Sequence, residues 1–405
     1  MSRNEPDRTA PVWLLPGLYF FSRVMVFMTL AALRVEPVSA FGDQGEYFAM
    51  GRLPGWPFFD YWVEYPPLFA FANALIYRLA LGNKTLFFML CSLLLALSGA
   101  ACLYFFERIA GRIFGPRQGF LRAVVLLALL IPLPYTWWTY DLLPLAFLLA
   151  GLDCLARGAD WQAGLALGLG MLTKWFPGFA LASALRYRPR RGFLRISAAA
   201  LGLAGLALGG LWLASPVMTA ASLASQPGRT SWQTVWAYLD GNRVTGHFIE
   251  ADWRLDPTLA AAPRGNPPRI HPYLTLPVFA LAGLFFFWRV KNTGERSLVA
   301  FVGITFGLFL LWSPGWSPQW MLYILPLVLL TLPFGQGLVL CAVLLVIALF
   351  EWPFALSQYW FRGTFAMAGL RTLAFALLVF LWQRITRRAE DPPLALRQCG
   401  GESQG

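Results

Sequence analysis

The sequence is poor in charged residues, which make up 13% of the chain, whereas about 25% is usual in a soluble domain. Hydrophobic residues make up 58%. Apolar runs of about twenty residues, each long enough to cross about 30 Å of hydrocarbon, recur from 12–33 to 364–382. This composition excludes an ordinary soluble domain and predicts an all-α polytopic membrane protein.

Cysteine and histidine are also scarce. The five cysteines form no CxxC pair, which argues against both a disulfide framework and a zinc site. The only histidines, His247 and His271, are too few and too far apart for a convincing metal site. The chain also lacks a Walker loop, a GxSxG elbow, an HExxH helix and a Rossmann fingerprint, so nucleotide hydrolysis and zinc proteolysis lose their usual signals.

Basic residues give the chain a net charge of +12, but they cluster beside the apolar runs, which indicates topology rather than nucleic-acid binding. The clusters at 108–122, 186–195, 289–296 and 384–388 should all be cytoplasmic. Treating every apolar run as a full span would put the first two clusters on opposite sides of the membrane. We therefore predict that 66–81, which contains two prolines and Arg78, lies in the interface as a juxtamembrane helix.

With that segment outside the membrane, about twelve spans remain and both termini are cytoplasmic. We expect the first span to be a retained helix rather than a cleaved signal. We predict one transmembrane domain over 1–389, with outer loops at 34–84 and 216–272, and a disordered cytoplasmic tail at 390–405. Two short spans, 162–173 and 176–186, meet at Thr173-Lys174 on the outer side, and Arg23 in the first span must face the bundle.

The first outer loop carries the most suggestive acids. Asp43 and Glu46 lie three residues apart, so a helical turn would bring both carboxylates to one face. They could act as a general base with a helper, or as half of a site for Mg²⁺ or Mn²⁺, or they could simply cap and solvate an interfacial helix. Glu64 precedes Pro66-Pro67, which start a helix without explaining the acid itself.

Further polar residues gather in the other predicted outer segments. Asp141 follows an aromatic turn, where it is either a helix N-cap or a functional acid. Lys174 lies between two half-length helices, where it is either a snorkelling anchor or a counter-ion to a lipid phosphate, and such a break favours a cavity open to the outside. The long outer loop offers aromatics that could stack on sugars or lie on the membrane, and polar contacts: Trp232, Trp236, Tyr238, Asp240, Asn242 and Arg243.

Four motifs then follow one another in a characteristic order after the acidic first loop: EYPPL, TYDLLPLAFLLAGL, AGLALGLGMLTKWFPGFAL and SPGWSPQWMLYILPL. Over about residues 12–335 the chain resembles the GT-C class of membrane glycosyltransferases, most closely the bacterial α-mannosyltransferases that use polyprenyl-phosphate mannose. The resemblance implies a GT-C type bundle with juxtamembrane helices in the first loop. The first loop reads DQGE rather than DxD, and the soluble C-terminal sugar-binding domain of some relatives is absent.

The resemblance places the catalytic acid on Asp43, with Glu46 as a second acid, and puts the YD and TK motifs on the active-site side. The predicted substrate-binding residues are Glu64, Asp141, Lys174, Asn242, Arg243 and Gln319. The expected partners are membrane lipids, a polyprenyl-phosphate sugar and a glycolipid, glycan or protein acceptor, without nucleic acid. Asp43 would deprotonate the acceptor, and Lys174 and Arg243 would stabilise the departing phosphate.

A transporter or flippase for a lipid-linked sugar is the alternative. Its many spans, Arg23 and the broken helices at Lys174 would then serve a translocation path. Transporters commonly show paired halves with matching interruptions, and this sequence shows none, while its polar groups gather on one predicted side. The sequence therefore favours an enzyme over a transporter.

Overall fold

The computed structural model describes residues 11–33, 43–226, 230–243 and 249–388, and every named element in these ranges is a helix. The first half contains α1 Leu14–Ala32, α2 Gln44–Gly51, α3 Pro67–Leu79, α4 Lys84–Phe114, α5 Pro116–Leu130, α6 Tyr135–Trp138, α7 Leu142–Ala156, α8 Asp160–Thr173, η1 Phe176–Phe179, α9 Ala180–Tyr187 and α10 Arg190–Ala214. The second half contains α11 Pro216–Ala224, α12 Val235–Asp240, η2 Ala251–Leu255, η3 Pro257–Leu259, α13 Pro272–Arg289, α14 Glu295–Trp312, η4 Pro318–Trp320, α15 Met321–Thr331, α16 Phe334–Leu349, η5 Phe350–Ala355 and α17 Phe361–Arg387. The predicted all-α class is confirmed.

Seven helices in the described ranges are long and apolar enough to cross a membrane: α1, α4, α10, α13, α14, α16 together with η5, and α17. Membrane residence is thereby supported, whereas the total of about twelve spans stays a prediction. The helices α5, α7, α8, α9 and α15 have only 8 to 15 residues. At 1.5 Å per residue, fifteen residues cover about 22 Å, less than the hydrocarbon thickness.

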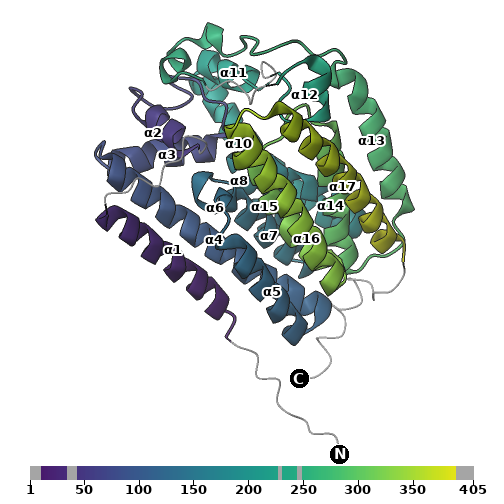
Figure 1. Cartoon of the computed structure of the whole chain (residues 1–405). Helices are drawn as coiled ribbons and strands as arrows, with labels where there is room; N and C mark the ends of the chain where they lie inside the picture. The colour runs from purple at the N-terminus through teal and green to yellow at the C-terminus, as the bar shows by residue number, and fades with distance from the viewer. Residues whose placement is uncertain (1–10, 34–42, 227–229, 244–248, 389–405) are drawn as a thin grey trace, which may run out of the picture.

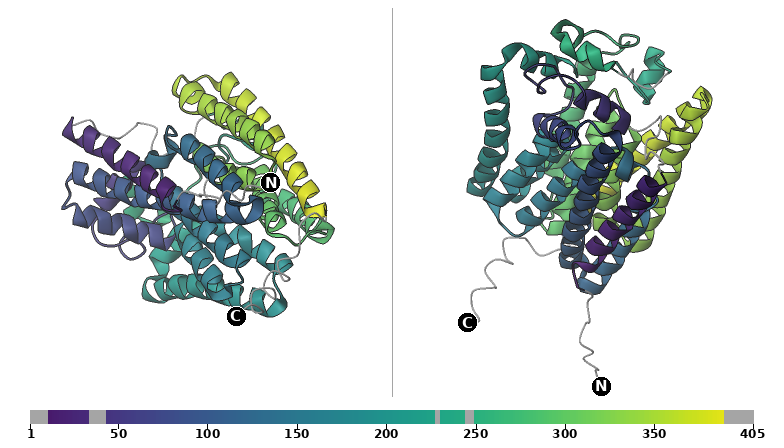
Figure 2. Two further views of the ribbon diagram at one scale, coloured as in Figure 1. Left: turned by 90° about the horizontal axis from the view of Figure 1, so that it is seen from below. Right: turned by 90° about the vertical axis from the view of Figure 1, so that its left-hand side faces the viewer.

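The long helices run side by side in one bundle (Figure 1). The beginning of α1 and the end of α17 lie at one end, and α11 and α12 lie at the other, which we call the loop end. α3 lies crosswise to the long helices near the loop end, as Figure 1 and the right-hand view of Figure 2 show. Pro66 is extended and Pro67 begins α3, as the sequence predicts for a proline-initiated helix across 66–81.

The core of the bundle surrounds α15, whose residues are all buried. Close approach of helices depends on small residues at particular points. At Gly99 in α4, an added Cβ would lie 2.2 Å from the Tyr19 ring of α1, so a larger residue would force these helices apart. Arg23 of α1 is buried, donates to the Ile131 carbonyl and lies with its guanidinium 5.4 Å from the Tyr19 ring centroid, which confirms that it faces the bundle.

Several predictions from the sequence fall outside the described ranges. They are the disordered tail at 390–405, the loop residue His247, and part of the first outer loop. His271 does lie in a loop, where its Nδ1 accepts from the Tyr273 amide at the start of α13. Four cysteines in the described ranges are buried and free: Cys91, Cys102, Cys154 and Cys341.

Candidate active site

Asp43 lies immediately before α2, and backbone contacts hold it at the loop end of the bundle. Its amide donates to the Trp138 carbonyl of α6 at 3.2 Å, and the Gln44 side chain donates to the neighbouring Trp137 carbonyl. Asn73 of α3 reaches α2 from the other side and donates to the Tyr47 carbonyl at 2.9 Å. Asp43 occupies the N-cap position at the start of α2, but its side chain makes no capping hydrogen bond there.

The phenol of Tyr47 orients the Asp43 carboxylate. Its hydroxyl donates to Asp43 Oδ2 at 3.1 Å, one helical turn along α2. Burial raises the pKa of Tyr47 well above its usual value, and the nearby Asp43 and Asp141 carboxylates act in the same direction. Because the phenol therefore keeps its proton at neutral pH, it is a permanent donor to Asp43.

An aromatic cluster connects this acid to the break between α8 and η1. The rings of Tyr47, Tyr65, Phe69 and Tyr140 pack on one another, with Phe69 and Tyr140 stacked at a centroid distance of 3.7 Å. Lys174 Nζ then lies 5.3 Å from the Tyr140 ring centroid, within the range of a cation–π interaction. Asp43 and Lys174 therefore both adjoin this cluster of rings, which we call the aromatic wall.

Lys174 forms an ion pair with Asp141, as neither alternative from the sequence foresaw. Its Nζ lies 2.5 Å from Asp141 Oδ1, and the two side chains are 15% and 0% exposed. α8 ends at Thr173, and Lys174 adopts an extended backbone before η1, which turns its side chain inward. The snorkelling interpretation of Lys174 is therefore wrong, and Asp141 occupies the N-cap position of α7 without a capping hydrogen bond.

A second ion cluster lies beside α2 and centres on Arg254, which sequence reasoning missed. Its Nη2 lies 2.9 Å from Glu46 Oε1 and 3.0 Å from Glu64 Oε1, and its Nη1 binds the other oxygen of Glu64. Burial lowers the pKa of Arg254, but Glu64 and Glu46 more than offset this and hold it above its ordinary value. The only sequence signal was indirect, since two buried acids require a cation.

This cluster changes how two predicted site residues are interpreted. Glu64, predicted to bind substrate, is buried and bound bidentately by Arg254. Glu46 binds Arg254, whereas Asp43 accepts from Tyr47, so the two acids predicted to act together have different partners. In the described ranges, no group of three histidine, cysteine, aspartate or glutamate side chains could hold a metal ion.

The long loop covers this end of the bundle, and its aromatic residues anchor it. Trp232 pairs with Gly315 through backbone hydrogen bonds that flank the SPGW turn. The Trp236 indole donates to the Leu311 carbonyl at 3.1 Å, and the Tyr238 hydroxyl donates to the Phe361 carbonyl at 2.7 Å. The polar atoms of Trp236 and Tyr238 thus bind the bundle, which leaves less of these side chains for a sugar.

The remaining predicted residues differ in their surroundings. Asn242 binds Ser231 at 2.9 Å and the Asn266 backbone, so it shapes the loop, whereas Arg243 is exposed. Gln319 is half-buried in η4, next to Trp320, whose ring centroid lies 5.7 Å from Lys174 Nζ. Gln319 therefore adjoins Trp320 on the Lys174 side of the site, and Arg243 lies at the surface of the protein.

A further ion pair fastens the long loop to the C-terminal helices. Arg371 of α17 binds Glu351 of η5 and the Gln233 carbonyl, and its guanidinium lies 4.5 Å from the Trp316 ring centroid. Both charged side chains are buried. In the sequence each is an isolated charge within an apolar run, and such charges are expected to pair with one another.

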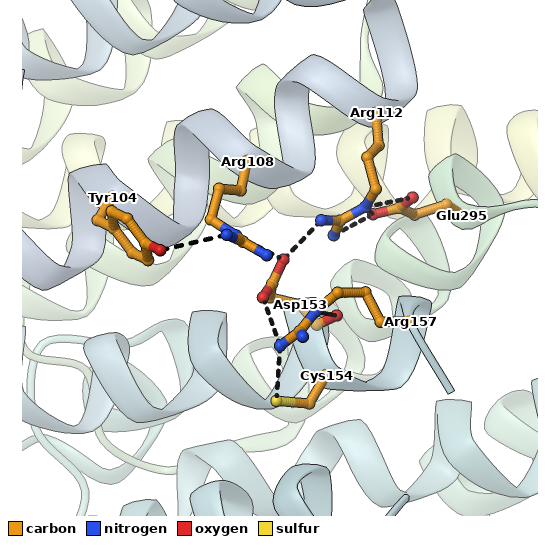
Figure 3. A network of polar contacts seen from close by, with 7 residues as sticks. All are labelled: Tyr104, Arg108, Arg112, Asp153, Cys154, Arg157 and Glu295. Atoms are coloured by element: carbon orange, nitrogen blue, oxygen red, sulfur yellow. Dashed lines mark hydrogen bonds and ion pairs between the residues drawn. The ribbon is translucent and has the colours of Figure 1, made fainter. Parts of the chain in front are cut away.

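A fourth set of ion pairs lies at the opposite end of α7 and joins three helices (Figure 3). Asp153 Oδ1 lies 2.6 Å from Arg112 Nη1 and 3.4 Å from Arg108 Nε, and its Oδ2 lies 2.9 Å from Arg157 Nη2. Arg112 also binds Glu295 of α14 at 2.8 Å. Twelve residues at 1.5 Å each separate Asp141 from Asp153, or about 18 Å along α7, so this network is remote from the aromatic wall.

Comparison with known proteins identifies a family. A family model described as Glycosyltransferase family 87 matches residues 62–314, more than half of the chain. The matched segment includes Glu64, Asp141, Lys174 and Arg254, and Asp43 lies upstream of it. No curated protein matches the chain.

Proposed function

The chain belongs to glycosyltransferase family 87 and is a membrane glycosyltransferase, and from this premise we propose that it transfers a sugar, mannose, from polyprenyl phosphate to an acceptor hydroxyl. Transfer inverts the anomeric configuration and takes place on the extracytoplasmic side. The observation that carries the proposal is the convergence of Asp43 and the Asp141–Lys174 pair on one aromatic wall at the loop end.

Asp43 is the general base in this proposal. Its carboxylate accepts the proton of the acceptor hydroxyl while the oxygen attacks the anomeric carbon, and the bond from that carbon to the phosphate oxygen breaks. Tyr47 donates to Asp43 Oδ2 and so fixes the orientation of the carboxylate. The aromatic rings beside Asp43 provide apolar faces on which a sugar ring can lie.

Lys174 stabilises the charge that develops on the departing lipid phosphate. Because Asp141 already holds its ammonium group in place, little reorganisation is needed when the phosphate arrives. The exposed Arg243 at the loop surface adds a second cation. Glu46 is occupied by Arg254, so a divalent ion shared with Asp43 would first have to displace that guanidinium, and the proposal assigns no step to a metal.

The extracytoplasmic placement rests on charge. Arg108, Arg112 and Arg157 gather at the end of the bundle remote from the site, and basic residues accumulate on the cytoplasmic side of membrane proteins. A lipid-borne donor suits this arrangement, because its tail can remain in hydrocarbon while its head reaches the aromatic wall. The family match indicates glycosyl transfer and lends no support to the transporter alternative.

The test is sugar transfer from radiolabelled polyprenyl-phosphate mannose in membranes that contain the Asp43→Asn enzyme. We expect activity to fall by about 10²–10⁴-fold, the range that a general base contributes. The matched control is Asp60→Asn in the same loop, whose exposed side chain accepts from the Trp56 amide at 2.6 Å, and which should transfer normally. Near-normal transfer by Asp43→Asn would reject the base, and transfer only from another lipid-linked hexose would reject mannose.

A further inference from the structure

Arg254 is a deeply buried cation at the loop end, and hydrogen bonds from Trp62 hold the backbone on both sides of it. Its side chain is 0% exposed. Its carbonyl accepts from the Trp62 amide at 2.9 Å, and the Trp62 indole donates to the carbonyls of Trp253 and Asp256, at 3.1 and 2.9 Å. The long outer loop is thereby joined to the first outer loop on both sides of Arg254, so the guanidinium projects from a well-braced backbone.

The guanidinium reaches the helix that begins beside the proposed base. Glu46 lies in the first turn of α2, three residues or about 4.5 Å of helix from Asp43. α2 has only eight residues, too few to form a stable helix alone, so its position must come from contacts with the rest of the protein. On the Asp43 side these contacts come from α6, and Asn73 supplies another from α3.

The contact with Arg254 differs from the others because it is ionic, buried and shared. One guanidinium holds Glu46 on α2 and Glu64 on the segment before α3, so it sets the spacing between two parts of the first outer loop. Only the planar fork of arginine can bind one carboxylate bidentately and still reach a second. A lysine would keep the charge but lose this geometry.

We propose that Arg254 is a positioning residue, which holds α2 through Glu46 and so places the Asp43 carboxylate for proton abstraction. The inference rests on the proposed function, because it presumes that Asp43 is the base. Arg254 itself contacts neither the sugar nor the phosphate. Its loss should therefore lower the rate of the chemical step and leave donor binding largely unchanged.

The experiment measures steady-state transfer by purified enzyme in lipid nanodiscs, with polyprenyl-phosphate mannose as donor. The variants are Arg254→Met, Arg254→Lys and Glu46→Gln, beside Asp43→Asn. The matched control is Asp256→Asn, two residues from Arg254 in the same loop, whose exposed side chain only caps the next turn by accepting from Thr258 at 2.9 Å. Size-exclusion profiles and thermal midpoints report whether each variant is folded.

We expect kcat to fall by about 100-fold in Arg254→Met and by about tenfold in Arg254→Lys and Glu46→Gln, with the donor KM changed by less than about threefold. Asp256→Asn should keep its kcat. If Arg254→Met does not fold, Arg254→Lys and Glu46→Gln carry the same test, since each preserves the size of the side chain.

Two results would overturn the positioning role: a normal kcat in folded Arg254→Lys and Glu46→Gln, or a raised donor KM with unchanged kcat, which would make Arg254 a donor-binding residue. Both leave the proposed function intact if Asp43→Asn is inactive. Conversely, an active Asp43→Asn enzyme would remove the base itself, whatever the Arg254 variants do. The failures of the two proposals are thus separable.

Discussion

The two ends of α7 carry buried aspartates with different partners. Asp141, at the loop end, is bound by the single cation Lys174, which lies at a break between helices beside an aromatic wall. Asp153, at the other end, has three guanidinium groups around it (Figure 3). One cation at a helix break suits a site that must accept another charged group. Three cations around one acid suit a structural contact that holds helices together.

The Asp153 network also connects more of the structure than the Asp141 pair does. Arg108 and Arg112 extend from α4, Asp153 belongs to α7, and Arg112 continues to Glu295 at the start of α14. Taken together these three helices are fixed at one end by a set of partly buried charge pairs. The role of a buried acid is thus indicated less by its residue type than by the number of cations around it and by the helices that supply them.

Removing the cation at the loop end should have the largest effect on transfer. Lys174→Met should lower transfer by at least about 100-fold, because a preorganised charge facing the departing phosphate is lost. The variant also leaves Asp141 as an uncompensated buried charge, which by itself destabilises a protein by about 3–5 kcal/mol. Transfer per folded enzyme, with folding read from size-exclusion profiles, is therefore the measurement required.

A double variant separates the two consequences of that change. Lys174→Met combined with Asp141→Asn removes both charges, so folding should recover toward that of the wild type while transfer stays low. If the double variant instead transferred sugar at the normal rate, the Asp141–Lys174 pair would be a structural joint like Asp153. The contrast between the two ends of α7 would then be lost.

Asp153→Asn should lower the stability of the protein and leave transfer nearly unchanged. Without the carboxylate, three arginines would face one another, but each is partly exposed, so the loss of stability should be about 2 kcal/mol rather than the full cost of a buried pair. We expect a lower thermal midpoint with kcat within about twofold of normal, since additive, distant sites seldom affect each other. A large fall in kcat with an unchanged midpoint would contradict this assignment.

The sequence predicted much of the fold because its signals are periodic and local. Apolar runs, a proline pair and clustered arginines located the long helices, the crosswise α3 and the helix break at Lys174. The same signals brought Asp43, Asp141 and Lys174 to one end of the bundle. These signals did not predict which charged residues form ion pairs. The pairs of Lys174 with Asp141 and of Arg254 with Glu46 join residues far apart in the chain.

The residues of the long loop show most clearly that contacts between distant segments cannot be predicted from the local sequence. Nothing in the local sequence distinguishes Arg254, which is fully buried, from Arg243, which is exposed. The two arginines have different environments because one meets two acids of another loop, and the sequence gives no register between loops. Aromatic residues of the loop could equally have stacked on sugars, and the anchoring of Trp236 and Tyr238 is visible only in three dimensions.

The smallest effect is expected within the Asp153 network itself. Arg157 lies on the same helix as Asp153, four residues further along, and its side chain is 45% exposed. An exposed pair within one helix contributes about 0.3–0.5 kcal/mol, and it joins no two helices, so Arg157→Ala should barely change the thermal midpoint or the transfer rate. Arg112→Ala is the matched comparison, because Arg112 links Asp153 to Glu295 across helices, and its loss should lower the midpoint clearly further. Equal shifts in the two variants would mean that the network acts through its total charge rather than through the helices it connects.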